Sequence, residues 1–150
     1  MSEELVHDGR RCATLMCRSC SRLCRVMNGI LAKTGVNMAQ CHAMSVLAEK
    51  GEMTMGVLAR ALGVTMGATT NLMDKLVEAE LVSRERDESD RRVVKVKLTP
   101  AGVDTLEGDM VSLSEFWAMV FEQIDGRDRT GFFEIYEQIL RLAESAGRKK

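Results

Sequence analysis

Residues 58–99 constrain the fold of this chain more than any other part of the sequence. Apolar residues at helical spacing predict a short first helix, which Gly63 ends because glycine tolerates the left-handed conformation that closes a helix. Thr65 has a side chain that can cap a second helix by accepting a hydrogen bond from a free backbone amide. Alternating apolar and charged residues then predict two half-buried strands, over residues 82–86 and 94–98. We therefore expect two short helices, a tight turn between them, and a charged β-hairpin.

The second helix of this pair is expected to have one buried face and one outward face. Its buried face would hold Thr69, Leu72, Met73 and Leu76, which recur at helical period. Its outward face would carry Gly67, Thr70, Asn71, Asp74 and Lys75. Two short helices arranged in this way form a helix-turn-helix, whose second helix can enter the major groove of DNA. With the hairpin as a wing, the sequence predicts a mainly α fold with a small β-wing, a winged helix-turn-helix.

The rest of the chain is predicted to be helical. Asn37 and Gln40 have the spacing of a capping box, and Thr99 followed by Pro100 is typical of a helix start. No repeat or long linker divides the sequence, so we expect a single domain over residues 1–150. The remaining helices are expected over residues 4–33, from Asn37 to Lys50, from Thr54 into the turn at Gly63, from Thr99 to about Ile124, and from about Asp128 to Ala146.

Composition places the chain among ordinary globular proteins. It has 150 residues, of which 45% are hydrophobic, and this suits one domain with one core. The acidic start, with Glu3 and Glu4, and the lack of a long apolar stretch predict neither a signal peptide nor a membrane span, and hence a cytoplasmic protein. Five cysteines are an odd number, and all lie before residue 42, so reduced thiols are expected rather than a disulfide framework.

Charge is distributed unevenly along the sequence. The pI of about 6.2 is too low for a generally basic protein that coats DNA. Residues 9–48 contain no acidic residue, whereas residues 82–98 hold six basic and four acidic ones. This asymmetry favours one face adapted to phosphates, although the arginines of the first helix could simply form its solvated face. The basic residues between 9 and 48 are Arg10, Arg11, Arg18, Arg22, Arg25 and Lys33.

Four features of the sequence, at characteristic spacing, resemble the MarR family (multiple antibiotic resistance regulators), small winged-helix transcription factors. The features are Leu58-Ala59 with Leu62-Gly63-Val64, the helix from Thr69 that closes with Asp74-Lys75-Leu76, the wing tip Asp90-Arg91-Arg92, and Leu98-Thr99-Pro100-Ala101-Gly102 at the start of the next helix. Each is common alone, but their order and spacing together are specific. The resemblance covers residues 36 to 108, and the flanking segments share the family's helical character.

The resemblance implies how such a protein works. It implies a homodimer formed by the helices of residues 1–35 and 100–150, with residues 36–99 as the winged-helix region that binds DNA. It also implies repression by occlusion of a promoter, and release by a small-molecule inducer. In the family the inducer pocket lies between the dimerisation helices and the DNA-binding region, which here would involve Met38 and Met44. The expected partner is a pseudo-palindromic operator in double-stranded DNA.

Candidate DNA contacts follow from the geometry of groove binding. Asn71 is the best reader of bases because an amide pairs bidentately with adenine, and Met66 and Ala68 could touch thymine methyl groups. The resemblance implies that Asp90 orients Arg92 for insertion into the minor groove. Arg84, Arg86, Arg91, Lys95 and Lys97 would neutralise phosphates. The full set is Thr65, Met66, Gly67, Ala68, Thr70, Asn71 and Lys75 on the second helix, and Arg84, Arg86, Asp90, Arg91 and Arg92 in the wing.

This set departs from the family's pattern in one respect. An arginine is common near the reading face in the family, whereas here Lys75 is the only cation between Thr65 and Leu76. The operator sequence therefore cannot be predicted, and direct base readout is expected to be modest.

Cysteines are the second unusual feature. Cys12, Cys17, Cys20 and Cys24 lie on the predicted first helix, and Cys41 lies on the next. Offsets of three, four and seven residues place Cys17, Cys20 and Cys24 on one edge of that helix, whereas Cys12 falls in the middle of its apolar face. Three interpretations stay open: small buried apolar residues, thiols that sense oxidants or electrophiles, and ligands of zinc or another thiol-bound metal. A metal site would use Cys20, Cys24 and His42; no cofactor is required for DNA binding.

Two other classes of function compete with a DNA-binding regulator. An enzyme is not expected, because the sequence lacks a glycine-rich phosphate loop and a nucleophile elbow. The Cys41–His42 pair does not replace them, since adjacent residues on a helix point about 100° apart. A protein-interaction module without DNA binding is the remaining alternative, because the second helix of the pair is only weakly basic.

Overall fold

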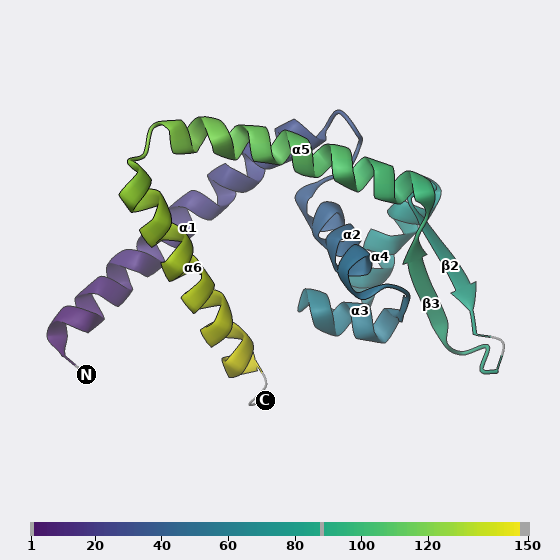
Figure 1. Cartoon of the computed structure of the whole chain (residues 1–150). Helices are drawn as coiled ribbons and strands as arrows, with labels where there is room; N and C mark the ends of the chain where they lie inside the picture. Colours follow the sequence, from purple (N-terminus) through teal and green to yellow (C-terminus); the bar gives the residue numbers. More distant parts are fainter. Residues whose placement is uncertain (1, 88, 148–150) are drawn as a thin grey trace. The chain divides into compact units, whose positions relative to one another are not determined.

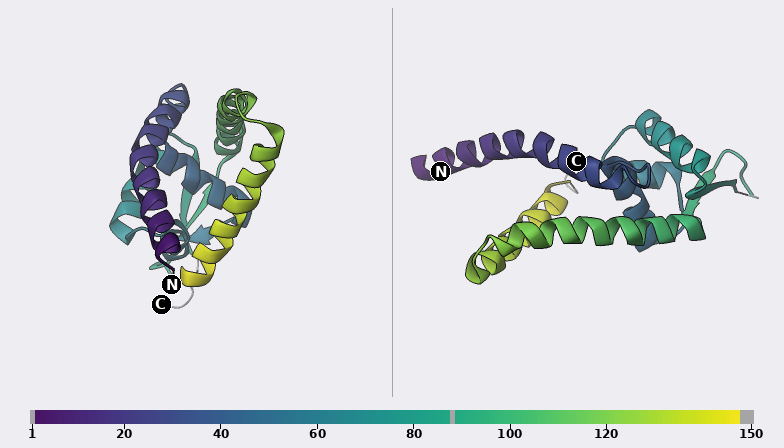
Figure 2. Two further views of the ribbon diagram at one scale, coloured as in Figure 1. Left: turned by 90° about the vertical axis from the view of Figure 1, so that its left-hand side faces the viewer. Right: turned by 90° about the horizontal axis from the view of Figure 1, so that it is seen from above.

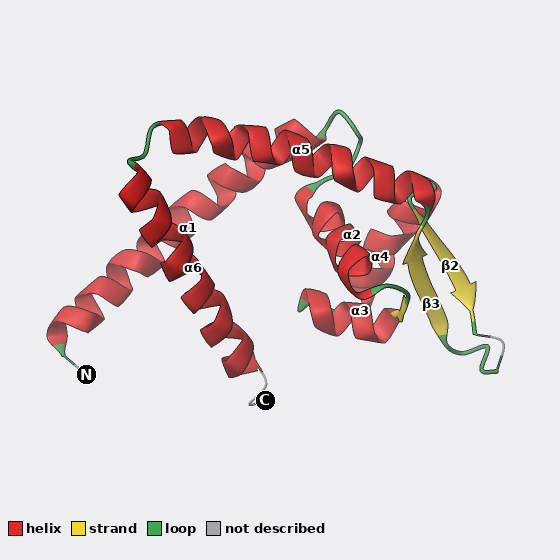
Figure 3. Cartoon of the chain, in the orientation of Figure 1, coloured by secondary structure: helices red, strands yellow, loops and turns green. Residues whose placement is uncertain are grey.

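The computed structural model describes residues 2–87 and 89–147, and its helices and strands are shown in Figures 1 and 3. The chain forms two compact units, one ending at Leu113 and the other starting at Ser114. The second unit holds the end of α5 (Pro100–Glu122) and α6 (Gly126–Gly147). The first unit holds α1 (Glu3–Leu31), α2 (Met38–Lys50), β1 (Met53–Thr54), α3 (Met55–Leu62), α4 (Met66–Glu78), β2 (Val82–Arg86), β3 (Val94–Leu98) and the first part of α5.

Helices begin where local capping signals predicted. The Asn37 side chain accepts a hydrogen bond from the Gln40 amide at 3.0 Å, and the Gln40 side chain accepts one from the Asn37 amide at 3.0 Å. Thr65 accepts from the amide of Ala68, and Thr99 accepts from the amide three residues later. These bonds satisfy free amides of the first helical turn, which confirms the predicted capping box and caps. Gly63 has φ 67°, as predicted for the residue that closes α3.

Two helix ends differ from the prediction. α1 ends at Leu31 rather than at residue 33, because a turn with Gly35 at φ 74° follows it. α6 begins at Gly126 rather than near Asp128, because the Asp125 carboxylate accepts a hydrogen bond from the amide of Arg127 and so caps the helix earlier.

The small sheet contains one strand more than the sequence predicted. Its order is β1-β3-β2, both pairs are antiparallel, and the register of the hairpin runs from Val82 opposite Leu98 to Arg86 opposite Val94. β1 places Met53 opposite Val96. With two residues, β1 is too short to show an alternating pattern, so only its pairing partner reveals it.

The core of the first unit lies between α2, α3, α4 and the sheet. Met44, Leu58, Met73, Leu76 and Val96 are almost completely buried in it. Thr69, Met73 and Leu76 are buried as predicted for the inner face of α4, whereas Leu72 is only half-buried. Helical periodicity therefore identified the correct face but overestimated its width.

Only the end of α1 joins this core. Leu31 is fully buried, and the N-terminal part of the helix extends beyond the other elements of the first unit (Figure 2). Leu5 and Met16 are 62% and 61% exposed, and Cys12 is exposed too. The predicted apolar face of α1 is therefore present, but its N-terminal part is exposed in the described first unit.

Aromatic residues hold the second unit together. Trp117 stacks on Phe121 with 5.7 Å between ring centroids, and Phe121 meets Phe133 edge to face at 5.3 Å. Phe132 stacks on Tyr136 at 5.6 Å. These contacts join the end of α5 to the start of α6, as expected for aromatic pairs at such distances. None of the described helices combines the length and apolar character needed to cross a membrane.

Candidate nucleic-acid interface

The N-terminal half of α4 presents the residues that the sequence predicted as base readers. Met66 is 51% exposed, which excludes a role in the core for this residue. Thr65, Gly67, Ala68, Asn71 and Lys75 are exposed as well. Thr70 is half-buried, and its hydroxyl donates to the backbone carbonyl of Met66 at 2.9 Å, so only its oxygen lone pairs are free to accept from a base.

The turn of the wing is organised by an aspartate that the sequence prediction did not single out. The Asp87 carboxylate accepts hydrogen bonds from the amides of Ser89 and Asp90 and from the Ser89 hydroxyl. It also pairs with Lys95, whose Nζ lies 2.6 Å from Oδ2. The hydrogen bond from Lys95, followed by those from Ser89 and Asp90, holds the pKa of Asp87 well below its usual range. An aspartate at the start of a turn is the signal that could have identified this role.

Asp90 contacts Arg92 differently from what the family resemblance implied. Its Oδ1 accepts a hydrogen bond from the backbone amide of Arg92 at 2.9 Å. Among the described residues there is no ion pair between the two side chains. Asp90 therefore fixes the backbone at the wing tip and leaves the guanidinium of Arg92 free to reach outward.

Arg84 connects the wing to α4, the second helix of the helix-turn-helix and hereafter the recognition helix. Its Nη1 lies 2.8 Å from Oδ1 of Asp74 on α4, and 31% of its side chain is exposed. The predicted role of Arg84, neutralising a phosphate, is thereby limited, because its charge already has a partner. Asp74, predicted only as an outward residue, instead helps to set the position of β2 against α4.

Two lysines of β3 are also paired with acids. Lys95 lies between Asp87 and Glu52, at 2.6 and 3.8 Å, and the Nζ of Lys97 is 2.8 Å from the Glu85 carboxylate. Their predicted role as phosphate contacts is therefore weakened too. Within residues 2–87 and 89–147, Arg86, Arg91 and Arg92 are the basic residues of the wing without an acidic partner.

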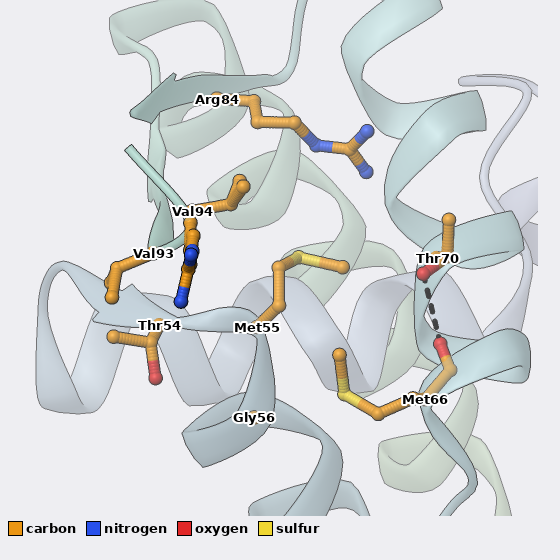
Figure 4. Close-up of a pocket in the computed structure, with 9 residues that line it drawn as sticks. Thr54, Met55, Gly56, Met66, Thr70, Arg84, Val93 and Val94 are labelled. Carbon is orange, nitrogen blue, oxygen red and sulfur yellow. Dashed lines mark hydrogen bonds between the residues drawn. The ribbon is translucent and has the colours of Figure 1, made fainter. Parts of the chain in front are cut away.

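A hollow of about 470 Å³ separates the recognition helix from the wing. In Figure 4 the side chains of Met55 and Met66 lie in it, with Thr70 on one side and Arg84 and Val94 on another. Arg92 and Val93 also line it. The start of α3, the start of α4 and the wing therefore form one continuous surface with an apolar floor and two arginines at its edges.

The cysteines fall into two environments. Cys12, Cys17, Cys20 and Cys24 are exposed on α1, and Cys41 is buried on α2. Although Cys24 is exposed, neighbouring protein atoms displace part of the water around its thiol and raise its pKa, and its hydrogen bond with Cys20 and the charge of Cys20 raise it further. These effects oppose the formation of a reactive thiolate.

Burial and the nearby carboxylate of Asp109 both raise the pKa of Cys41, and a hydrogen bond with Ser45 lowers it only in part. Cys41 is therefore buried in the core, and its raised pKa disfavours the thiolate. In the described parts of the chain no three His, Cys, Asp or Glu side chains are placed to hold one ion, so Cys20, Cys24 and His42 are not brought together within one chain.

Comparisons with known proteins point to one family. The family model described as the MarR family matches residues 36–94. The chain is 29% identical over 120 residues to the uncharacterized HTH-type transcriptional regulator YsmB of Bacillus subtilis (strain 168), covering 80% of each chain. It is 47% identical over 66 residues to YcgE, another uncharacterized HTH-type transcriptional regulator of that organism, covering 43% of each chain.

Solved structures share the fold. A MarR transcriptional regulator from Methanosarcina mazei Go1 superposes with a TM-score of 0.81 at 21% identity, covering 91% of this chain and 99% of that one. A mutant of MarR from E. coli, complexed with operator DNA, has a TM-score of 0.73 at 22% identity, covering 91% of this chain and 96% of that one. At this level of identity, the likeness concerns the fold alone.

Proposed function

We propose that this chain is a winged-helix transcriptional regulator of the MarR family, and that it represses transcription as a dimer bound to a pseudo-palindromic DNA operator. The surface formed by the start of α4 and the wing supports this proposal. The exposed start of α4 lies beside a wing in which Arg86, Arg91 and Arg92 have no acidic partner among the described residues. Such a surface suits a major groove and the adjacent minor groove, whose narrow form attracts arginine.

The exposed apolar faces of the terminal helices support a dimer. A contiguous apolar surface on a soluble chain usually marks an interaction site. Two copies would also bring two recognition helices to half-sites about one helical turn apart, as a symmetric operator requires. The large apolar residues of these helices that are at least half exposed are Leu5, Leu15 and Met16 on α1, and Phe133, Ile135, Tyr136, Leu140 and Leu142 on α6.

Electrophoretic mobility shift against DNA upstream of the chain's own gene tests the proposal, with native mass spectrometry of the protein in parallel. We expect a sequence-specific complex and a dimer mass. A dimer that binds no duplex more tightly than random DNA would contradict the regulator and favour a protein-interaction module.

Asn71→Ala is expected to relax base discrimination at one position in each half-site. The amide is the one side chain on the exposed face of α4 that can pair bidentately with a base, and such a pair contributes about 1–3 kcal/mol of discrimination. In vitro selection from a random library measures the change. Lys75→Ala is the control: a lysine on a phosphate should weaken binding to all sequences alike. An unchanged selected motif would remove Asn71 from the base readers.

Release of the operator requires a signal. We propose that this signal acts on α1, either by binding of a small organic ligand or by modification of the exposed thiols. The specific observation in favour of thiols is that Cys17, Cys20 and Cys24 are all exposed on one edge of the helix, with Cys20 and Cys24 in hydrogen-bond contact. When one of these sulfurs displaces the iodide of an alkylating agent such as iodoacetamide, a sulfur–carbon bond forms and the thiol proton is lost to solvent. The added group would lie beside the apolar face of α1 and would alter the separation of the two recognition helices.

A Cys17/Cys20/Cys24→Ser variant separates the two signals. We expect iodoacetamide to lower the operator affinity of the wild type by at least tenfold and to leave the triple variant unchanged. Cys12→Ser is the matched control, because it removes an exposed thiol of the same helix and should keep the response. If alkylated and reduced wild-type protein bind the operator equally, the thiols are not the signal site, and the inducer must be a small organic ligand.

A further inference from the structure

One carboxylate lies inside the first unit with no charged partner. Asp109 on α5 is 2% exposed, and its Oδ2 is buried without a hydrogen-bond partner. Its Oδ1 lies 2.9 Å from the hydroxyl oxygen of Thr34, in the turn between α1 and α2. An ionised carboxylate in such a place would have at most one hydrogen bond, and burying a charge in this way is strongly unfavourable.

The hydrogen bonds of Thr34 show where a proton is needed. The Thr34 hydroxyl oxygen lies 2.9 Å from the backbone carbonyl oxygen of Leu31 and 2.9 Å from Oδ1 of Asp109. A hydroxyl has one hydrogen to donate, and both of these neighbours would be acceptors if Asp109 were ionised. Both short contacts are satisfied together when Thr34 donates to Leu31 and a protonated Asp109 donates to Thr34.

Among the described residues, none with a positive charge forms an ion pair that would stabilise the ionised form of Asp109. From α2, the titratable group that faces it is the buried thiol of Cys41, whose own pKa is raised by the negative charge of Asp109. Lys33 of the turn and His42 of α2 are exposed, and neither forms an ion pair with Asp109 in the described chain. Burial raises the pKa of Asp109, whereas a hydrogen bond donated by Thr34 to the ionised form would lower it.

We propose that Asp109 is a proton-binding site, which joins the turn between α1 and α2 to α5 as a neutral acid at pH values where an ordinary aspartate is ionised. Loss of the proton leaves a buried charge and removes the donor to Thr34, so the contact between the turn and α5 is lost. This pH dependence is separate from DNA binding, because the junction between α1 and α5 responds to pH whatever the chain binds.

The sign of the pH effect follows from linkage. The pKa of Asp109 is higher in the folded chain than in the unfolded one, so its contribution to stability is complete below the unfolded value, about 3.9. As pH rises above that value, the folded chain holds one proton more than the unfolded chain. The unfolding constant therefore rises about tenfold per pH unit until the pH passes the folded pKa, where the effect levels off.

Urea unfolding of the full chain between pH 4 and pH 9 tests this, with Asp109→Asn as the variant. Asparagine has a similar shape and can donate to Thr34 at every pH. We expect the ratio of wild-type to variant unfolding constants to rise with pH and then reach a plateau. Asp104→Asn, an exposed aspartate of the same helix, is the matched control and should give a constant ratio. A constant ratio for Asp109→Asn, or the same rise for both variants, would overturn the proposal.

Thr34→Val determines which group donates. If protonated Asp109 donates to Thr34, removing the hydroxyl destabilises the neutral acid, and the plateau moves to lower pH. If instead Thr34 donates to an ionised Asp109, removing it destabilises the charged form, and the plateau moves to higher pH. A shift to higher pH would therefore contradict the neutral acid even if Asp109→Asn changes the pH profile. Neither measurement involves DNA, so a failure of the proposed function and a failure of this inference are distinguishable.

Discussion

Replacement of Gly102 by alanine is expected to lower the free energy of unfolding by about 3 kcal/mol or more. A Cβ at this position of α5 would lie 2.0 Å from the backbone oxygen of Leu81 and 3.2 Å from Cδ2 of Leu98. The Leu81 carbonyl cannot easily move, because it accepts a hydrogen bond from the Thr99 amide at 3.1 Å. The Leu81 amide in turn donates a hydrogen bond to the carbonyl of Leu76. The clash is with backbone at the junction of α4, β2 and α5, so relief would displace all three elements.

Gly108→Ala is the matched control for this prediction. Gly108 lies on the same helix, and a Cβ there would meet nothing within 4 Å. Alanine in a helix interior is favoured over glycine by up to about 1 kcal/mol, so this variant should be slightly more stable than the wild type. Urea unfolding followed by circular dichroism measures both. Equal stability of the two variants would mean that α5 does not pack against Leu81 as closely as described.

Arg92→Ala is expected to weaken operator binding by about 1–3 kcal/mol, or roughly fivefold to more than a hundredfold. The Asp90 carboxylate accepts a hydrogen bond from the backbone amide of Arg92 and so fixes the backbone of the wing tip. The guanidinium of Arg92 has no acidic partner among the described residues. Such a guanidinium is available to the narrow minor groove, where its low hydration makes it more suitable than an ammonium group. Fluorescence anisotropy with a labelled operator at several salt concentrations measures the loss.

Two further variants show what kind of contact Arg92 makes. Arg92→Lys should lose most of the affinity if the side chain enters the minor groove, and little if it only neutralises a phosphate. Lys97→Ala is the control within the wing, because the charge of Lys97 is already paired with Glu85 at 2.8 Å. It should change the dependence on salt by much less than one phosphate contact would. Arg92→Ala with wild-type affinity would show that the wing does not insert.

Local signals in the sequence were sufficient for most of the helices and the hairpin. Capping by Asn37, Thr65 and Thr99 acts between residues three positions apart, and Gly63 closes α3 through its own backbone conformation. Such interactions depend on few neighbours, so residue type and spacing predict them. The same holds for the outward face of α4, where helical period alone separated exposed Asn71 from buried Met73.

The tertiary structure decides which basic residues of the wing are paired with acidic side chains. Arg84, Lys95 and Lys97 look alike in sequence to Arg86 and Arg92, and all five were expected to contact DNA. The fold brings Asp74, Glu52, Asp87 and Glu85 to the first three, and these partners come from α4, from the loop before β1, or from across the hairpin. A charge at the surface pairs with whatever lies within a few ångströms, and sequence distance carries little information about that.

The sequence by itself determined most of the elements and the outward face of α4, because those depend on period, caps and spacing along the chain. Only the tertiary structure decided that Gly102 must lack a side chain, that β1 joins the sheet, and that Asp109 meets Thr34. Thr34 and Asp109 are 75 residues apart, and no local pattern links them. Contacts of this kind form only when packing of the core brings distant segments together, and they are therefore visible only in the folded molecule.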